Sequence, residues 1–208
     1  TFFYTVSTSG LPVALSILIA KCDTEKRYAD KARVYKVALV FFVALGLVFT
    51  LFMSLGSKML GDMIGNSRAS SAILAIAPVM LFICVISARR GYFQGHQNMM
   101  PTALSQLIEA VGKLCFGIMF SLYAVRRGYS YPIIAAFAIL GITLSEALCM
   151  LCLMLFPKAR ERSKEYTITD FDALKSIIKT ALPITLSSVV LSLTSLADLG
   201  LVMNRLVD

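Results

Sequence analysis

The apolar residues of this chain come in long blocks, and the length of these blocks constrains the fold more than any other feature. The six expected spans lie near residues 1–20, 34–56, 70–88, 102–124, 133–156 and 180–203. Each has about the 17–25 residues that a helix needs to cross a hydrocarbon core. Charged residues make up only 15% of the chain, whereas a soluble domain carries roughly a quarter. The sequence therefore predicts an all-α, polytopic membrane helix bundle.

Basic residues gather in three of the stretches between these spans. Residues 21–36, 89–101 and 157–179 hold fourteen Lys and Arg residues, whereas the other connecting stretches hold four. By the positive-inside rule, we expect loops 21–33, 89–101 and 157–179 to be cytoplasmic. The net charge of +8 is then mainly a signal of topology. A nucleic-acid partner is not expected, because the spans leave no room for a soluble basic domain.

The two ends of the chain are unusual for a complete membrane protein. The sequence begins with Thr1 rather than Met, and it stops just past an apolar span. No basic region precedes the first apolar run, so a signal peptide is not expected. We expect instead a fragment of a larger protein that lacks at least one helix before Thr1.

The sequence holds no arrangement of residues typical of an enzyme. It contains no Walker loop and no nucleophile–base constellation. Cys149 and Cys152 have C-x-x-C spacing, but the single histidine, His96, lies in another segment, so a zinc site would lack ligands. We predict no metal, no cofactor and no enzymatic activity.

One polar stripe runs through span 102–124. Its members recur at intervals of three and four, which places them on one side of a helix; they are Thr102, Ser105, Gln106, Glu109 and Lys113. Glu109 and Lys113 also stand in the favourable order for an ion pair along a helix. Two interpretations stay open. The pair neutralises itself inside the bundle, or the stripe lines a hydrated cavity into which Gln106 points.

Two further carboxylates inside spans are candidates for a substrate cavity or for ion coupling. Glu146 lies well inside span 133–156, and Asp198 lies in span 180–203. Charged groups at bilayer depth are costly unless they face water or a partner. The partner of Glu146 is not evident from the sequence.

Glycine and proline mark positions where a helix is expected to break or bend. Gly10 and Pro12 lie in the first span, Pro78 in the third and Pro183 in the last. Proline removes one backbone hydrogen bond from a helix interior, and discontinuous helices are typical of the substrate regions of transporters. A simple kink is the alternative at each position.

The segment from Arg89 to Pro101 joins two spans and combines basic, aromatic and glycine residues. One interpretation is a gate or lipid-contact element that includes Arg89, Arg90, Tyr92 and Gln94, with the arginines on anionic head groups. The other, which we favour, is a tight cytoplasmic turn whose glycines fit the backbone and whose arginines only determine the topology.

The order of residues in this segment also resembles a family signature. It reads Arg90-Gly91-Tyr92-Phe93-Gln94-Gly95, followed by Asn98, Pro101-Thr102-Ala103 and Ser105 to Glu109. The sequence is similar to the multidrug/oligosaccharidyl-lipid/polysaccharide exporter superfamily, in the branch of MurJ-like lipid II flippases and stage V sporulation protein B. The resemblance implies about fourteen helices in two lobes. It would place residues 1–156 in the amino-terminal lobe, 157–179 in a cytoplasmic connector and 180–208 in the first helix of the second lobe.

The same resemblance implies a function. The expected substrate is a polyprenyl-pyrophosphate-linked sugar, either lipid II or a polysaccharide repeat unit, moved by alternating access across the bacterial plasma membrane. The expected partners are this substrate, membrane lipids and a coupling ion (Na⁺ or H⁺) or the membrane potential, in a monomeric transporter. Two alternatives stay open: a cation-coupled antiporter of the same superfamily that uses Glu109, Glu146 or Asp198, and a non-transporting assembly protein.

Overall fold

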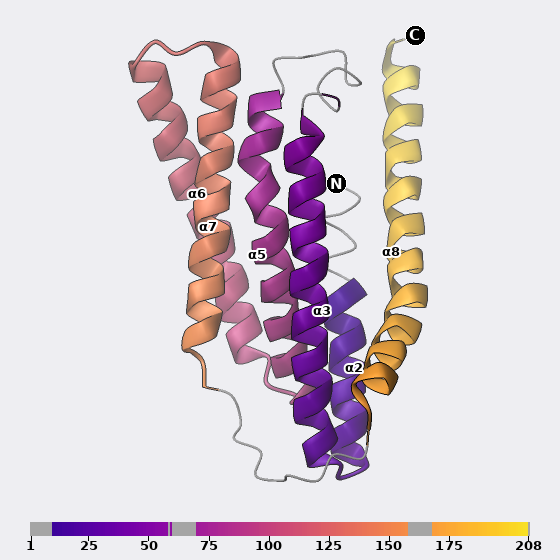
Figure 1. Cartoon of the computed structure of the whole chain (residues 1–208). Helices are drawn as coiled ribbons and strands as arrows, with labels where there is room; N and C mark the ends of the chain where they lie inside the picture. Colours follow the sequence, from indigo (N-terminus) through magenta and orange to yellow (C-terminus); the bar gives the residue numbers. More distant parts are fainter. Residues whose placement is uncertain (1–9, 58, 60–69, 158–167, 208) are drawn as a thin grey trace.

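The computed structural model describes residues 10–57, 59, 70–157 and 168–207, without the side chains of 70–72 and, beyond Val190, with that of Thr194 alone. The described chain is helical throughout apart from short turns. Its helices are α2 (Leu11–Thr24), α3 (Tyr28–Leu55), α5 (Ser70–Gly95), α6 (Met100–Arg126), α7 (Tyr131–Leu155) and α8 (Asp170–Val207). They run roughly side by side, with α6 and α7 at one side of the bundle and α8 at the other (Figure 1).

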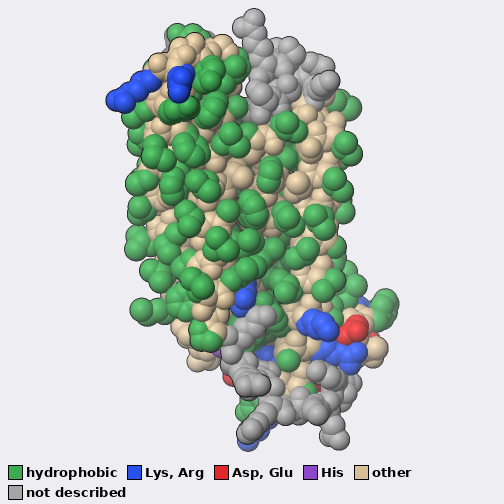
Figure 2. All heavy atoms as spheres, turned by 60° about the vertical axis from the view of Figure 1, so that its left-hand side comes forward, with side chains coloured by type: hydrophobic (Ala, Val, Ile, Leu, Met, Phe, Trp, Pro, Cys, Tyr) green, Lys and Arg blue, Asp and Glu red, His purple; other side chains and the backbone are tan. Residues whose placement is uncertain are grey.

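Five of these helices are long and apolar enough to cross a membrane. They are Tyr28–Leu55, Ile73–Gly95, Met100–Arg126, Tyr131–Leu155 and Asp170–Val190. Figure 2 shows apolar side chains over most of one face, with the charged side chains gathered toward the two ends. The expected all-α membrane bundle is confirmed. The first expected span, near residues 1–20, lies partly outside the described residues, and its described part belongs to α2.

Helix α5 lies at the centre of the packing. It contacts α2, α3 and α7, while α6 packs mainly on α7, and α8 packs on α2 and α3. The largest fully buried apolar side chains are Phe42, Leu15, Ile19, Leu153 and Ile177. Because lipid tails are as apolar as these side chains, close van der Waals packing and polar contacts must hold such helices together.

Pro78 lies inside α5, yet the helix continues past it. A proline leaves nearby carbonyl groups without their usual partner. Thr50 Oγ1 of α3 donates to the carbonyl of Ala77 at 3.1 Å, and Thr143 Oγ1 of α7 donates to that of Ala75 at 2.9 Å. These hydroxyl groups of two neighbouring helices bind carbonyls beside the proline, and so they hold α3 and α7 against this part of α5.

The other expected helix breaks also differ from the structure. Pro183 lies inside the continuous helix α8. Pro12 lies in the first turn of α2, where its missing N–H is harmless, and Gly10 has helical backbone angles of φ −74° and ψ −49°. The residues before Gly10 lie outside the described part of the chain. Pro78 and Pro183 are thus not helix breaks, and no break is seen at Gly10 or Pro12 within the described residues.

The connections between the helices are shorter than the sequence predicts. Residues 25–27 are all that separates α2 from α3, and residues 96–99 all that separates α5 from α6. Helix α8 begins at Asp170, inside the expected connector 157–179. The expected loops 21–33 and 89–101 are therefore mostly helical. The charged residues there find partners on neighbouring segments, so they do not end the helices.

Candidate functional site

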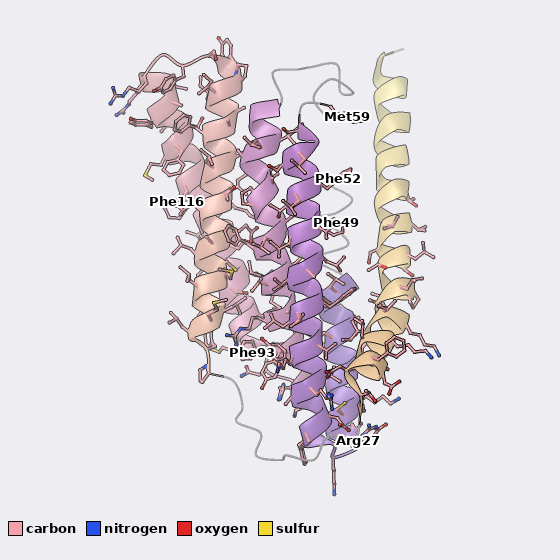
Figure 3. All side chains as sticks on the ribbon, in the orientation of Figure 1. Arg27, Phe49, Phe52, Met59, Phe93 and Phe116 are labelled. Carbon is pink, nitrogen blue, oxygen red and sulfur yellow. The ribbon has the colours of Figure 1, made fainter. Side chains whose placement is uncertain are left out.

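Small residues bring α6 and α7 close enough for their polar side chains to meet. A Cβ atom on Gly141 of α7 would lie 2.6 Å from the carbonyl oxygen of Phe116, and one on Gly112 of α6 would overlap the hydroxyl of Ser145. Ser145 Oγ donates a hydrogen bond of 2.9 Å to the carbonyl of Glu109. Figure 3 labels Phe116 at this contact between the two helices.

Four charged side chains from three helices form a network beside this contact. Arg90 of α5 donates through Nη2 to Glu109 Oε2 of α6 at 2.7 Å. The other oxygen of Glu109 accepts a hydrogen bond from Lys113 Nζ. The same ammonium lies 2.8 Å from Glu146 Oε1 of α7. Positive and negative groups therefore alternate, and the formal charge of the network is zero.

Neutral groups orient Arg90 within this network. Its Nε donates to Ser105 Oγ at 2.9 Å, and Ser105 in turn donates to the carbonyl of Thr102 at 2.7 Å. Arg90 Nη2 also lies 3.4 Å from Cys149 Sγ, whose thiol contacts the carbonyl of Ser105 at 3.3 Å. The guanidinium group is thus held by both α6 and α7.

The network lies inside the helix bundle. The exposed fraction of the side chain is 1% for Glu146, 12% for Arg90, 14% for Glu109 and 27% for Lys113. An isolated charge at such a depth is strongly unfavourable, and removing one partner of a buried pair costs about 3–5 kcal/mol. Pairing is therefore the reason that these four groups are tolerated together.

Glu109, Glu146 and Cys149 also bring their potential ligand atoms within 4.8 Å of one another. Carboxylate and thiolate groups can bind a metal ion. Here, however, Arg90 and Lys113 already contact the same carboxylates. A divalent cation would meet two positive charges, so the arrangement suits an internal ion-pair network better than a metal site.

The structure thus brings together three of the five predicted cavity residues. Glu109, Lys113 and Glu146 share the network, and Lys113 is the partner of Glu146 that the sequence did not reveal. Gln106 is exposed on α6. Asp198 belongs to α8, but its side chain lies outside the described part of the structure. The contacts favour the interpretation in which the stripe neutralises itself, enlarged here by Arg90 and Glu146.

The turn between the two spans is shorter than the expected Arg89–Pro101 segment: Arg89 to Gly95 form the last turns of α5, and only residues 96–99 separate α5 from α6. Its glycines serve helix packing. A Cβ on Gly91 would lie 2.7 Å from the carbonyl oxygen of Pro12, and one on Gly95 would lie 2.9 Å from that of Ser16. Gly91 and Gly95 stand four residues apart, which is the small-residue spacing that lets two helices approach. Sequence inspection could have found this signal.

The four gate candidates differ in their surroundings. Tyr92 is buried, with its ring centroid 4.6 Å from that of Tyr35 on α3. Phe93, labelled in Figure 3, is buried as well and packs on Phe156 beyond the end of α7. Arg90 is held in the ion network. Arg89 and Gln94 are each partly exposed. Close packing of α5 on α2 explains why the aromatic side chains point inward.

A second charged cluster, missed by the sequence reasoning, lies where α2, α3 and the start of α8 meet. Asp30 of α3 is 1% exposed, and it accepts hydrogen bonds from Arg27 Nε at 2.9 Å and from the backbone N–H of Ile168 at 3.0 Å. Figure 3 shows Arg27 at this end of the bundle. Arg33 of α3 also forms an ion pair with Asp170, the first residue of α8. These contacts fasten the beginning of α8 to α3.

Asp23 and Lys31 complete this cluster on the side of α2. Lys31 Nζ donates to Asp23 Oδ1 at 2.8 Å, and only 5% of the Lys31 side chain is exposed. The Lys31 ammonium group lowers the pKa of the Asp23 carboxyl below its ordinary value of 3.8. The sequence presented these residues only as part of a basic stretch, because their partners become apparent only when the helices are packed.

Comparison with known proteins adds an independent finding. Residues 1–207 match the model of a family described as polysaccharide biosynthesis protein. In Bacillus subtilis (strain 168), the chain is 35% identical to stage V sporulation protein B over 79% of the chain and 32% of that protein. It is 26% identical to the uncharacterized membrane protein YabM over 93% of the chain and 37% of that protein.

A third relative from the same organism is the lipid II flippase MurJ, which is 25% identical over 56% of the chain and 23% of that protein. The chain thus spans about a third of the length of the first two relatives and about a quarter of the third. No solved structure gave a significant match to the chain.

Proposed function

Because the chain belongs to the polysaccharide biosynthesis protein family, we propose that the whole protein is a flippase for a polyprenyl-pyrophosphate-linked sugar in the bacterial plasma membrane. The observation that carries this proposal is the family match over residues 1–207, together with the similarity to a lipid II flippase. The substrate is lipid II or a polysaccharide repeat unit on the same kind of lipid. Such a sugar needs a protein, because hydrocarbon strongly opposes the entry of its polar groups.

The packing of the helices suits an alternating-access mechanism. The ion network ties α5, α6 and α7 into one body, and α5 in turn packs closely on α2 and α3. Helix α8 lies beside this body with its main contacts on α2 and α3. Transporters of this kind work largely by rocking one rigid unit against another. We assign α2–α7 to one such unit and α8 to the beginning of the other.

The ion network has a structural role in this proposal. Arg90 and Lys113 are the cations of this network, and both are engaged by carboxylates. A pyrophosphate group would have to compete with Glu109 and Glu146 for them. We therefore expect the network to hold the lobe together during transport and the substrate to be bound elsewhere in the whole protein.

Charge placement orients the protein in the membrane. The ends that carry Lys21 to Lys36 and the 157–179 segment hold most of the basic residues, and we place them on the cytoplasmic side. The α6–α7 turn, with Arg126 and Arg127, then faces outward. In this orientation the cluster around Asp30 lies on the cytoplasmic side, next to the first residues of α8.

A cation-coupled antiporter is the second candidate function, and one observation favours it. Glu146 is almost fully buried, and Lys113 bridges it to Glu109. A proton or Na⁺ that neutralised Glu146 would weaken its hold on Lys113 and so change the contact between α6 and α7. Such a protein would need Glu146 for ion coupling, whereas the flippase needs it only for stability.

Growth rescue tests the proposed function. The full-length protein is expressed in a bacterium depleted of its own lipid II flippase, with membrane abundance measured in parallel, and a strain deprived of a polysaccharide-unit flippase serves as the second arm. Rescue of either strain supports the proposal and identifies the sugar. If the protein reaches normal membrane abundance but rescues neither strain, the flippase proposal fails. Drug-efflux assays on Glu146→Gln then become the next experiment.

A further inference from the structure

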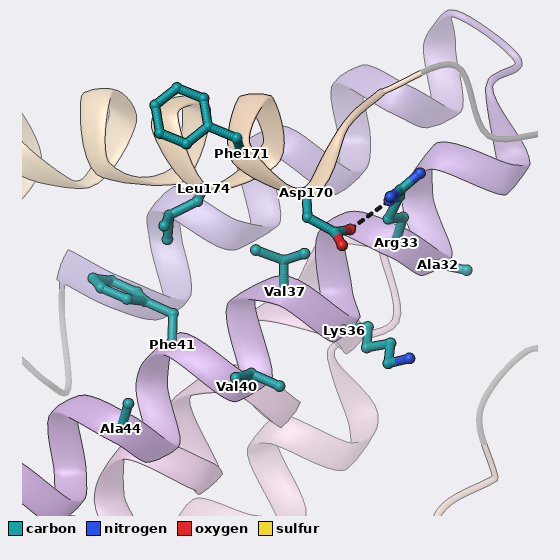
Figure 4. Close-up of a pocket in the computed structure, with 10 residues that line it drawn as sticks. All are labelled: Ala32, Arg33, Lys36, Val37, Val40, Phe41, Ala44, Asp170, Phe171 and Leu174. Atoms are coloured by element: carbon teal, nitrogen blue, oxygen red, sulfur yellow. Dashed lines mark hydrogen bonds and ion pairs between the residues drawn. The ribbon is translucent and has the colours of Figure 1, made fainter.

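An apolar groove of about 880 Å³ lies between α3 and α8, outside the ion network. Figure 4 shows its two walls: Val40, Phe41 and Ala44 follow one another along α3, and Leu174 of α8 faces them. Val40 is 64% exposed. The groove therefore presents an uncovered apolar surface on a helix that is long enough to span the membrane.

The basic end of the groove is formed by Arg33 and Lys36, which lie on the same side of α3 (Figure 4). Arg33 is paired with Asp170, while Lys36 is exposed. A smaller hollow of about 350 Å³ adjoins the groove and shares Leu174 with it, and it adds Lys175. Because Asp170 also lines the groove and pairs with Arg33, the mouth carries one net positive charge, that of Lys36, beside an apolar floor.

The length of the groove matches one leaflet of a bilayer. Ala44 lies eleven positions after Arg33, and at 1.5 Å per residue this corresponds to about 16 Å of helix. Half of a hydrocarbon core that is about 30 Å thick measures about 15 Å. A molecule with its charged group at Arg33 would therefore reach Ala44 with an apolar tail that extends to the centre of the membrane.

We propose that this groove binds an anionic phospholipid of the cytoplasmic leaflet, such as phosphatidylglycerol. Its phosphate lies between Arg33 and Lys36, and one acyl chain lies along Val37 to Ala44 and against Leu174. The cytoplasmic leaflet is rich in anionic lipids, which attract basic residues near the membrane surface. The bound lipid touches both α3 and α8, so it bridges the two helices beside the Arg33–Asp170 ion pair.

The chemistry of the groove favours a lipid over an extended peptide. A peptide at this depth would leave its backbone N–H and C=O groups without partners, because continuous helices on both sides use their own backbone groups internally. An acyl chain has no such requirement. This proposal concerns a bound lipid rather than a transported one, so it holds whichever solute the protein moves.

Native mass spectrometry of the full-length protein tests the binding site. The purified protein is titrated with phosphatidylglycerol and, separately, with phosphatidylcholine of the same acyl chains. We expect preferential binding of phosphatidylglycerol, and Lys36→Gln should weaken that binding roughly fivefold. The matched control is Lys21→Gln, which removes an exposed charge at the same end of the bundle, outside the groove. Its affinity for phosphatidylglycerol should equal that of the unaltered protein.

A phosphatidylglycerol with a photoreactive acyl chain locates the lipid. Cross-links should map to residues 37–44 of α3 and 171–174 of α8, and Ala44→Phe, which fills the deep end of the groove, should abolish them. The proposal is overturned if Lys36→Gln and Lys21→Gln behave alike, or if both lipids bind equally. It is also overturned if the cross-links avoid these two segments because another helix of the protein covers the groove. Binding is measured without transport, so a failed growth rescue would leave this result unaffected.

Discussion

Removal of Lys113 should destabilise the protein because it leaves Glu146 buried without its cation. Glu146 is 1% exposed and Lys113 27%. Breaking a buried ion pair by deleting one partner costs about 3–5 kcal/mol, and the partial exposure of Lys113 points to the lower end of that range. We therefore expect Lys113→Met to lower the free energy of unfolding by about 3 kcal/mol.

The double variant Lys113→Met/Glu146→Gln should recover most of this loss. It removes one positive and one negative charge, and the remaining Arg90–Glu109 pair is neutral. We expect a net cost of about 1 kcal/mol, so the second substitution recovers about 2 kcal/mol of the loss caused by Lys113→Met, and the coupling energy between the two positions is at least this large. The single variant Glu146→Gln leaves Lys113 paired with Glu109, so it should be milder than Lys113→Met.

Labelling of a buried thiol measures these differences in the full-length protein. Cys84 on α5 is fully buried, whereas Cys115 is exposed and Cys152 partly exposed, so both are replaced by Ser to remove their signals. The labelling rate of Cys84 then reports how often the bundle opens, and 2 kcal/mol corresponds to about a thirtyfold difference in rate. Membrane abundance should follow the same order.

Two results would refute this reasoning. If Lys113→Met labels as slowly as the unaltered protein, Glu146 is hydrated and the network lines a water-filled cavity. If the double variant is as unstable as the two single variants combined, the two side chains act independently, and the ion pair is not what holds α6 to α7.

Three further outcomes follow from other contacts. Gly95→Ala should destabilise the α2–α5 contact by about 1–3 kcal/mol, because the added methyl would lie 2.9 Å from the α2 backbone. Gly117→Ala is the control: its added methyl would have its nearest neighbour at 3.9 Å, so it should be neutral in the same thiol-labelling assay. Asp30→Ala should lower the free energy of unfolding by about 1–3 kcal/mol and loosen the start of α8, since the backbone N–H of Ile168 loses its acceptor. An unchanged labelling rate of buried thiols near the meeting point of α2, α3 and α8 would contradict this prediction. Because the pKa of Asp23 is lowered by Lys31, the stability that this pair adds should be present above about pH 4 and be lost as the pH falls through the lowered value. Unfolding measured from pH 3 to 6 should show this loss, and Asp23→Asn should remove it.

The helices themselves could be predicted from the sequence because hydrocarbon selects for length and apolarity. An apolar run such as 34–56 can satisfy its backbone in a membrane only as a helix, and α3 covers all of it except its last residue, Gly56, which caps the helix. The ends could not be predicted in the same way. Asp23 and Lys31 look like loop residues by hydropathy, but they pair across the corner between α2 and α3, so both helices continue through them.

Arg90 shows why only part of the charged network could be predicted from the sequence. Because Arg90 lies just after an apolar block, the sequence predicts that it belongs to a cytoplasmic loop. Its partner, Glu109, lies nineteen positions away on another helix, and no local pattern links the two. The pairing of Glu109 with Lys113 was visible because both lie on one helix at a spacing of four. Glu146 lies on a third helix, so only the packed bundle connects it to Lys113.

The proposed orientation in the membrane does not depend on whether Arg90 lies in a loop or in α5. Several basic residues on the proposed cytoplasmic side lie in the end turns of helices, as Arg89 and Arg90 do in α5. Even without these two arginines, residues 21–36 and 157–179 hold twelve basic residues, against four on the opposite side. The asymmetry that the positive-inside rule uses is therefore carried by residues 21–36 and 157–179, and it does not depend on the 89–101 segment.

The residues that make this chain recognisable are also the ones that hold it together. Arg90, Gly91 and Gly95 carry the resemblance, and the structure places them against Glu109 and the backbone of α2. Contacts that build a neutral, closely packed lobe are compatible with any substrate, because none of them recognises a sugar. This separation explains why the sequence indicates the family clearly and the substrate poorly. Substitutions in the network should therefore lower protein abundance and transport together, whereas a substrate-binding residue, once found, should lower transport alone.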